Sequence, residues 1–206
     1  MKRYVGIDPS TTTGFVAMDE QGNVLRQKDL TGVGNADPMR ITTLISEIMD
    51  HIHPGDVVCI ESPATHAKGQ GVGFMWGLAY GIRGALFRRG IKYYDVAPTA
   101  LKKFCDASRH RFDAEGNKLD SKAAVADGVY EHFGYTHPSN NVIDAYVLAQ
   151  IAYAIATPDE LGREDYQTEV IETVLKPAHE KKAEKAAANK KKKARAAAKA
   201  AQGVLL

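Results

Sequence analysis

The first part of the chain alternates short apolar runs with turn-forming residues. Apolar runs cover residues 4–8, 15–18 and 24–30, separated by a Ser/Thr-rich turn and by a loop around Gly22. Short runs joined by tight loops are typical of antiparallel strands connected by hairpins. This part of the sequence therefore predicts a three-stranded antiparallel meander.

Helical and strand-like patterns alternate from residue 38 onward. Residues 38–52 repeat apolar positions with a helical period, whereas residues 57–60 form a continuous and largely β-branched apolar run. A run without polar alternation indicates a strand buried on both faces, as in a parallel sheet. A fifth strand is expected at 91–96, and further helices at 74–89, from residue 98, at 121–132 and at 141–156. The pattern as a whole predicts an α/β fold.

Charge divides the chain into an acidic body and a basic tail. The 206 residues have a formal net charge of +2, but residues 176–206 alone carry +8 and residues 1–175 carry −6. Such asymmetry indicates a polyanionic partner, nucleic acid first and an anionic membrane surface second. We expect three parts: a folded domain at 1–157, an acidic and partly helical connector at 158–177, and a Lys/Ala-rich tail at 178–206 that is disordered or transiently helical.

Cysteine content and hydropathy exclude several classes of protein. Cys59 and Cys105 are too few for a disulfide scaffold or a zinc ribbon. No apolar stretch reaches the roughly 18 residues of a membrane-spanning helix, and the chain opens without the apolar segment of a secretory leader. We therefore expect a cytoplasmic protein without a membrane anchor.

Three carboxylates occupy positions typical of a catalytic metal site. Asp8 and Glu61 end two predicted strands, and Asp144 lies in a helix that is apolar on nearly every side. A buried carboxylate is costly unless a cation pairs with it, and oxygen ligands suit Mg²⁺ or Mn²⁺. The three residues predict a site for two ions that hydrolyses phosphodiesters. The alternatives are that Asp8 only caps a turn and that Glu61 is an ordinary loop carboxylate.

The motifs around these carboxylates resemble those of the RuvC family of Holliday-junction resolvases. The matching segments are Gly6-Ile7-Asp8-Pro9-Ser10 with Thr12, Thr13 and Gly14, then Cys59-Ile60-Glu61, and the helix 141–149. The resemblance covers about residues 2–157 and implies an RNase H-like fold, a mixed sheet of three antiparallel and then two parallel strands flanked by helices. It implies a homodimeric, divalent-metal-dependent endonuclease acting on branched DNA, and the sequence does not distinguish four-way junctions from forks and flaps as its substrate. The small size and the Lys/Ala tail resemble phage-borne members of the family.

One position departs from the pattern of the family. An acidic residue, or sometimes His, usually stands one turn before the last Asp, and here Asn141 occupies that place. The resemblance implies that Asn141 is a fourth metal ligand. Because an amide is neutral, Asn141→Asp is expected to raise metal affinity and cleavage. The alternatives are that His137 or a water substitutes as ligand, or that Asn141 inactivates the site.

Basic and aromatic residues supply candidates for DNA contact. Lys102 or Lys103, and Lys122, resemble lysines of the family's junction-binding face, and Lys122 is also expected to stabilise charge at the scissile phosphate. Phe74 and Trp76 follow a glycine-rich loop and are expected to stack on an unpaired base, unless they belong to the core. The tail is expected to contact the DNA backbone through Lys190, Lys191, Lys192 and Lys193.

Two other functions fit parts of the sequence. The first is a non-catalytic protein that binds branched DNA, in which Asn141 marks a decayed site. The second is an actin-like ATPase or sugar kinase, because the segment 8–12 resembles the first phosphate loop of that group. That architecture needs two lobes and a second phosphate motif, for which the body has no room.

Overall fold

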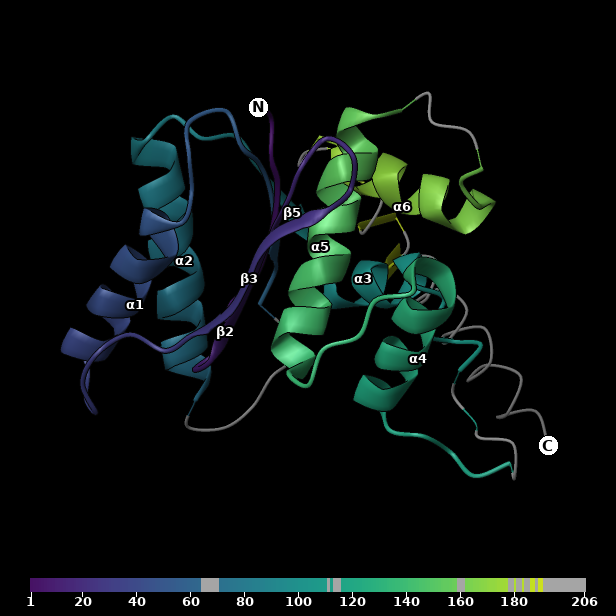
Figure 1. The fold of residues 1–206 in the computed structure, drawn as a ribbon, viewed down its shortest axis with the longest axis horizontal. Helices are drawn as coiled ribbons and strands as arrows, with labels where there is room; N and C mark the ends of the chain where they lie inside the picture. The colour runs from purple at the N-terminus through teal and green to yellow at the C-terminus, as the bar shows by residue number, and fades with distance from the viewer. Residues whose placement is uncertain are drawn as a thin grey trace. The chain divides into compact units, whose positions relative to one another are not determined.

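A five-stranded sheet forms the centre of the computed structural model, which describes residues 1–63, 71–110, 112, 116–158 and 162–177, and 180, 183, 186, 187, 189 and 190 in the tail. The strand order is β3-β2-β1-β4-β5 (Figure 1). The first three strands pair antiparallel, whereas β4 lies parallel to β1 and β5 lies parallel to β4. The strands are β1 (Tyr4–Asp8), β2 (Thr13–Met18), β3 (Val24–Leu30), β4 (Val57–Glu61) and β5 (Tyr93–Val96). The mixed sheet predicted from the sequence is confirmed.

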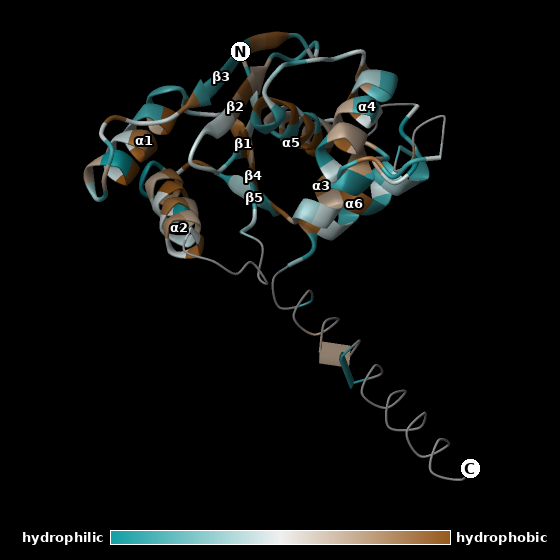
Figure 2. Cartoon of the chain, turned by 90° about the horizontal axis from the view of Figure 1, so that it is seen from below, coloured by the Kyte–Doolittle hydropathy of each residue, from teal (hydrophilic) through white to brown (hydrophobic). Residues whose placement is uncertain are grey.

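Helices cover both faces of this sheet because successive side chains of a strand point to opposite sides. In β1, Val5 and Ile7 join one hydrophobic cluster, whereas Tyr4 joins the other. The first cluster packs under α1 (Met39–Asp50) and α2 (Val72–Arg88). On the other face lie α3 (Pro98–Phe104), α4 (Ser121–Phe133), α5 (Asn140–Ala156) and α6 (Asp165–Leu175), as Figures 1 and 2 show.

Helix α5 is the central helix of the second layer and is apolar around most of its circumference. It contacts β1, β2 and β4 as well as α3 and α4. The Ser139 hydroxyl accepts a hydrogen bond from the backbone N–H of Val142 at the start of the helix. Asp120 caps α4 in the same way and accepts from the N–H groups of Lys122 and Ala123. Both helix starts follow the capping residues that the sequence offers.

Contacts divide the chain into a compact unit of residues 1–174 and a second unit of residues 175–206. Helix α6 buries Val170, Ile171 and Val174 in the cluster that surrounds α5. The buried Gln167 amide donates to the carbonyl oxygen of Phe104 at 3.1 Å. The segment predicted as a connector therefore contributes a packed helix to the body. Among the described residues, no helix has the length and apolarity needed to cross a membrane.

Candidate active site

Helix α5 lies directly against the backbone of β1 and β2, and two glycines permit this approach. A Cβ atom on Gly6 would lie 1.9 Å from the carbonyl oxygen of Ala145, and one on Gly14 would lie equally close to another carbonyl of the same helix. A side chain at either position would push the helix away, because a close-packed interior has no room for it. Since Asp8 follows Gly6 closely and Asp144 precedes Ala145, this contact brings the two carboxyl groups towards each other.

Asp8 and Glu61 meet because they end neighbouring parallel strands. Ile7 pairs with Ile60, so the next residue of each strand emerges at the same edge of the sheet. Asp8 is only 6% exposed, and its carboxyl group shares a hydrogen bond with that of Glu61. Burial, followed by the charge of Glu61, raises the pKa of Asp8 well above its usual range. A cation bound between the two carboxyl groups would offset both the cost of burial and their mutual repulsion.

Asp144 adds a third acidic group from α5. Burial, followed by the charge of Asp8, raises the pKa of Asp144 to about 7. Burial also raises the pKa of Glu61, and the charge of Asp144 adds to this effect, although the hydrogen bond from Asp8 opposes it. Lys122 lowers the pKa of Asp8 and Asp144, and Lys102 lowers that of Glu61 and Asp144. Three mutually repelling carboxyl groups thus face two lysines.

The donor atoms suit a hard divalent cation, since paired carboxylates repel each other until a positive charge binds between them. The described side chains, however, do not surround a single ion. Within the described ranges, no three His, Cys, Asp or Glu side chains stand close enough to hold one ion among them. Asp8 and Glu61 form a close pair, and Asp144 interacts with both through its charge. The donor atoms therefore fit a metal site in which Asp8 and Glu61 form a close pair and Asp144 lies beside them.

Asn141 lies one helical turn before Asp144 and against the turn that joins β1 to β2. Its Nδ2 donates a hydrogen bond of 2.7 Å to the carbonyl oxygen of Thr12. The same turn is closed internally, because the Ser10 hydroxyl donates to the Thr12 carbonyl and the Thr13 hydroxyl donates to the Ser10 carbonyl. The amide nitrogen is therefore bonded to the protein, and the amide oxygen is the side-chain atom left for a cation.

Arg83 and His137 form hydrogen bonds near the site, but neither bond was predicted from the sequence. Arg83 of α2 donates twice to Asp95 Oδ1, at 2.8 and 2.5 Å, and reaches the carbonyl oxygen of Glu61 at 3.2 Å. It fixes the backbone from which the Glu61 carboxyl group projects. The only signal for this role in the sequence was a basic residue in the interior of a largely apolar helix. His137, the alternative ligand, instead accepts a hydrogen bond from the Ser139 N–H through Nδ1 at 3.1 Å.

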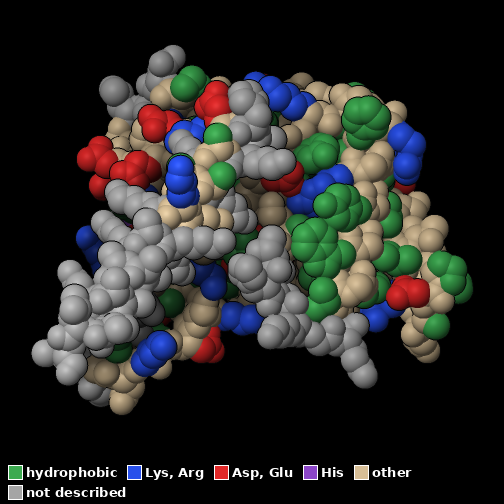
Figure 3. Space-filling view, turned by 180° about the vertical axis from the view of Figure 1, so that it is seen from behind, with side chains coloured by type: hydrophobic (Ala, Val, Ile, Leu, Met, Phe, Trp, Pro, Cys, Tyr) green, Lys and Arg blue, Asp and Glu red, His purple; other side chains and the backbone are tan. Residues whose placement is uncertain are grey.

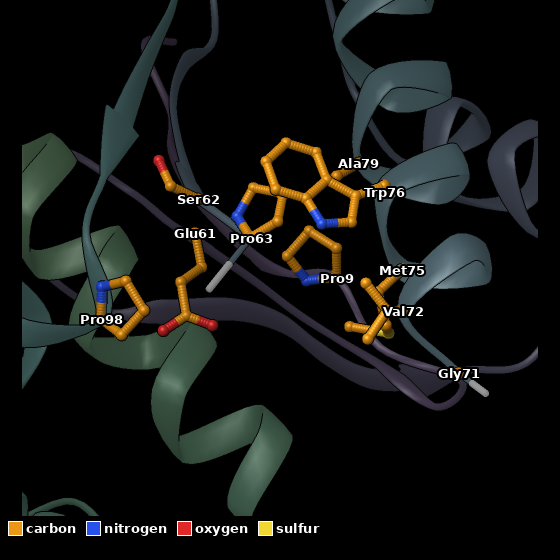
Figure 4. A pocket seen from close by; sticks show the side chains of 10 residues that line it. All are labelled: Pro9, Glu61, Ser62, Pro63, Gly71, Val72, Met75, Trp76, Ala79 and Pro98. Atoms are coloured by element: carbon orange, nitrogen blue, oxygen red, sulfur yellow. The ribbon is translucent and has the colours of Figure 1, made fainter. Parts of the chain in front are cut away.

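A pocket of about 300 Å³ opens beside Glu61 (Figure 4). Trp76 lines it, together with the rings of three prolines, and stacks on Tyr80 with 5.7 Å between ring centroids. Phe74 does not line this pocket. It packs against the core under α1 and α2, and the Arg40 guanidinium lies 5.5 Å from its ring. Of the two aromatic residues predicted to stack on DNA, only Trp76 faces this space.

A second pocket, of about 730 Å³, lies between α3 and the start of α4. Lys102 and Lys103 line it together with Lys118. Lys103 also forms an ion pair with Glu169 of α6. Sequence patterns did not single out Lys118, because it lies in a polar segment without helical or strand periodicity. Lys102 connects this basic surface to the candidate site, because its charge lowers the pKa of Glu61 and Asp144.

The strand order and the acidic edge define an RNase H-like α/β fold. Similar solved structures are RuvC from Thermus thermophilus alone and the same protein in complex with a Holliday junction substrate. For both, the TM-score is 0.56 and the identity 17%, over 76% of this chain and 96% of the RuvC chain. No protein-family model and no curated protein sequence matches the chain. The chain therefore has the RuvC fold that its motifs predicted, and kinship with phage-borne members stays a prediction.

Proposed function

We propose that this protein is a divalent-metal-dependent endonuclease that resolves Holliday junctions and other branched DNA. The observation that carries the proposal is the meeting of Asp8, Glu61 and Asp144 with Lys102 and Lys122 at one edge of a RuvC fold. Carboxylates of this kind bind cations, and lysines beside them bind phosphate. The similar RuvC structure described above contains a Holliday junction substrate.

The chain's own residues have distinct parts in this reaction. The three carboxyl groups would hold two Mg²⁺ or Mn²⁺ ions, with the amide oxygen of Asn141 as a neutral fourth ligand. Ions bound there supply an activated water and stabilise the leaving oxygen. Lys102 and Lys122 hold the scissile phosphate and offset the negative charge that grows on it. Burial of Asp8 strengthens these interactions by limiting solvent screening.

The apolar pocket beside Glu61 is suited to an unpaired base. Trp76 offers a flat surface there, and stacking of a base on an aromatic ring contributes about 1–3 kcal/mol. Unstacked bases occur at the crossover of a junction and are absent from uninterrupted duplex. We therefore assign the pocket to a base near the cleaved phosphate. A 2-aminopurine at the crossover whose fluorescence does not change on binding would contradict this assignment.

The outer face of α2 is suited to contact with a second copy of the chain. Tyr80 and Phe87 are 64% and 80% exposed, and a Cβ on Gly84, which lies between them along the helix, would meet only the Arg88 side chain of the same helix. Hydrophobic side chains gather over this side of the molecule in Figure 3. A glycine such as Gly84 lets a second helix approach closely, and a two-fold dimer buries the same face of both copies. We therefore include a homodimer in the proposal. A monomeric mass in sedimentation equilibrium would contradict this part of it.

Removal of residues 176–206 should weaken binding to every DNA shape by a similar factor and flatten its salt dependence. The segment carries +8 and the body −6, and each duplex phosphate neutralised contributes about −0.9 to the log–log salt slope. Contacts to the DNA backbone add affinity without sequence information. Lys190 is exposed, whereas the predicted contacts at Lys191, Lys192 and Lys193 lie outside the described residues.

Binding titrations over a salt series, on a junction and on a duplex of equal length, check this tail prediction. The preference for the junction should survive, because it depends on the folded body. Equal salt slopes for the full-length and shortened proteins would show that the tail does not contact DNA. Loss of junction preference with intact duplex binding would make the tail part of the recognition surface instead.

Cleavage of a synthetic four-way junction tests the proposed function directly. With Mg²⁺ or Mn²⁺ the protein should nick two symmetry-related strands of the junction. With EDTA it should bind the junction without cutting it. Binding without cleavage under every divalent cation would favour the non-catalytic alternative. Stabilisation by ATP without any cleavage would favour the actin-like alternative, although the described residues build one sheet of five strands and no second lobe.

A further inference from the structure

The turn between β1 and β2 is held from two helices at once. Asn141 of α5 donates to the carbonyl oxygen of Thr12 at 2.7 Å, and Arg40 of α1 donates to that of Thr11 at 2.9 Å. This turn begins immediately after Asp8. The carbonyl groups of Thr11 and Thr12 thus each accept a hydrogen bond from a side chain that lies far away in the sequence, and that of Thr12 also accepts one from the Ser10 hydroxyl.

We propose that Asn141 is a positioning residue, whose Nδ2 ties this turn to α5 and thereby fixes Asp8 relative to Asp144. The assignment rests on the proposed nuclease function and adds to it a donor role that an aspartate at neutral pH does not provide. The amide oxygen remains free to act as a ligand, so the two roles are compatible. The donor role of Nδ2, more than the ligand role of the amide oxygen, therefore determines how a substitution at Asn141 changes stability and cleavage.

The close approach of the backbone makes this hydrogen bond hard to replace. A Cβ on Gly14 would lie 1.9 Å from the carbonyl oxygen of Asn141, so β2 and α5 already touch beside the turn. Little movement is available to relieve a mismatch. An aspartate would place a carboxylate oxygen where Nδ2 now meets the Thr12 carbonyl oxygen, and two acceptors without a hydrogen repel each other. This reverses the effect of Asn141→Asp that the sequence resemblance implies.

Thermal unfolding in EDTA separates the two roles, because no ligand role operates without metal. Asn141→Ala should lower the melting temperature by about 2–4 °C, which is the shift expected for one lost hydrogen bond in a chain of this size. Asn141→Asp should lower it further. If Asn141→Asp is as stable as the wild type, or more stable, the proposal is overturned.

Asn140→Asp is the matched control. It makes the same chemical change one residue earlier, at an exposed position in the first turn of α5. A carboxylate there interacts favourably with the helix dipole, so the melting temperature should stay the same or rise. An equal loss in both variants would mean that added negative charge, and no specific hydrogen bond, destabilises this end of the helix, and would overturn the proposal.

Cleavage kinetics test whether the hydrogen bond positions the catalytic groups. Asn141→Asp and Asn141→Ala should lower kcat on the order of tenfold or more while the KM for DNA stays unchanged, since small displacements at reacting groups are costly. A higher kcat for Asn141→Asp, with a lower Mg²⁺ requirement, would overturn the proposal in favour of a dominant ligand role. If the wild type cleaves no branched DNA, the proposed function fails, whereas the EDTA comparison still decides whether the bond holds the turn.

Discussion

Replacement of Asp144 by asparagine should abolish metal-dependent cleavage and, at the same time, stabilise the metal-free protein above neutral pH. Asp144 stands beside Asp8 and Glu61 and interacts with both through its charge. Loss of one carboxylate ligand removes several kcal/mol of transition-state stabilisation, which corresponds to a decrease in kcat of about 10³-fold or more. Junction binding in Ca²⁺ or EDTA should change little, because lysines supply the contacts to phosphate.

The stability change follows from the raised pKa of Asp144. Its pKa is about 7 in the folded protein and close to 4 in an unfolded chain. A raised pKa means that the folded state binds the proton more tightly. Asp144 therefore contributes stability below about pH 4, and this contribution is lost as the pH rises to about 7. An asparagine side chain at this position carries no charge to bury, so the variant should melt at a higher temperature than the wild type at pH 8 and at a similar temperature at pH 4.

Melting curves in EDTA at the two pH values, together with single-turnover cleavage, check both parts of this prediction. Asp127→Asn is a suitable control because Asp127 is exposed on α4, and it should change neither quantity. Cleavage by Asp144→Asn at the wild-type rate would show that Asp144 is not part of the catalytic site. A variant that loses cleavage without gaining stability at pH 8 would show that the carboxylate is not under electrostatic strain.

The strands were predictable because each is marked by local sequence. The turn before β2 and the glycine loop before β3 separate apolar runs, and the unbroken run of β4 indicated burial on both faces. Boundaries were less accurate. The fifth strand was expected from residue 91 but begins at Tyr93, because the Ile91 N–H bonds back to the Leu86 carbonyl at the end of α2 and Gly90 has φ of +66°. This helix ending depends on geometry that apolar patterning does not report.

Candidate site residues were predictable where chemistry and position coincide. Carboxylates at the ends of buried strands and inside an apolar helix are costly without a cation, so Asp8, Glu61 and Asp144 stood out. The hydrogen bond from Asn141 to Thr12 joins residues 129 positions apart, and no local pattern indicates it. The same holds for Arg83, which bonds to the Glu61 carbonyl of β4 and to Asp95 of β5, both distant from it in the sequence.

The contact between α5 and β1 should be the most sensitive point of the fold, and Gly6→Ala is the substitution that tests it. A Cβ at Gly6 would lie 1.9 Å from the Ala145 carbonyl oxygen and 2.5 Å from the Ala149 nitrogen. Both atoms belong to backbone, so no side chain can rotate away and the whole helix must shift. Overpacking of this kind costs about 3 kcal/mol or more in the free energy of unfolding.

Activity should fall further than stability in this variant. A displaced α5 carries Asp144 away from Asp8, so the cleavage rate should decrease even at temperatures where Gly6→Ala is fully folded. Gly73→Ala is the matched control, because a Cβ there meets nothing within 4 Å and alanine favours a helix by about 1 kcal/mol over glycine. It should leave cleavage unchanged and raise the melting temperature slightly. If denaturant unfolding and cleavage are the same for Gly6→Ala as for the wild type, then α5 does not rest on the backbone of β1, and the geometry that brings the carboxyl groups together must be different.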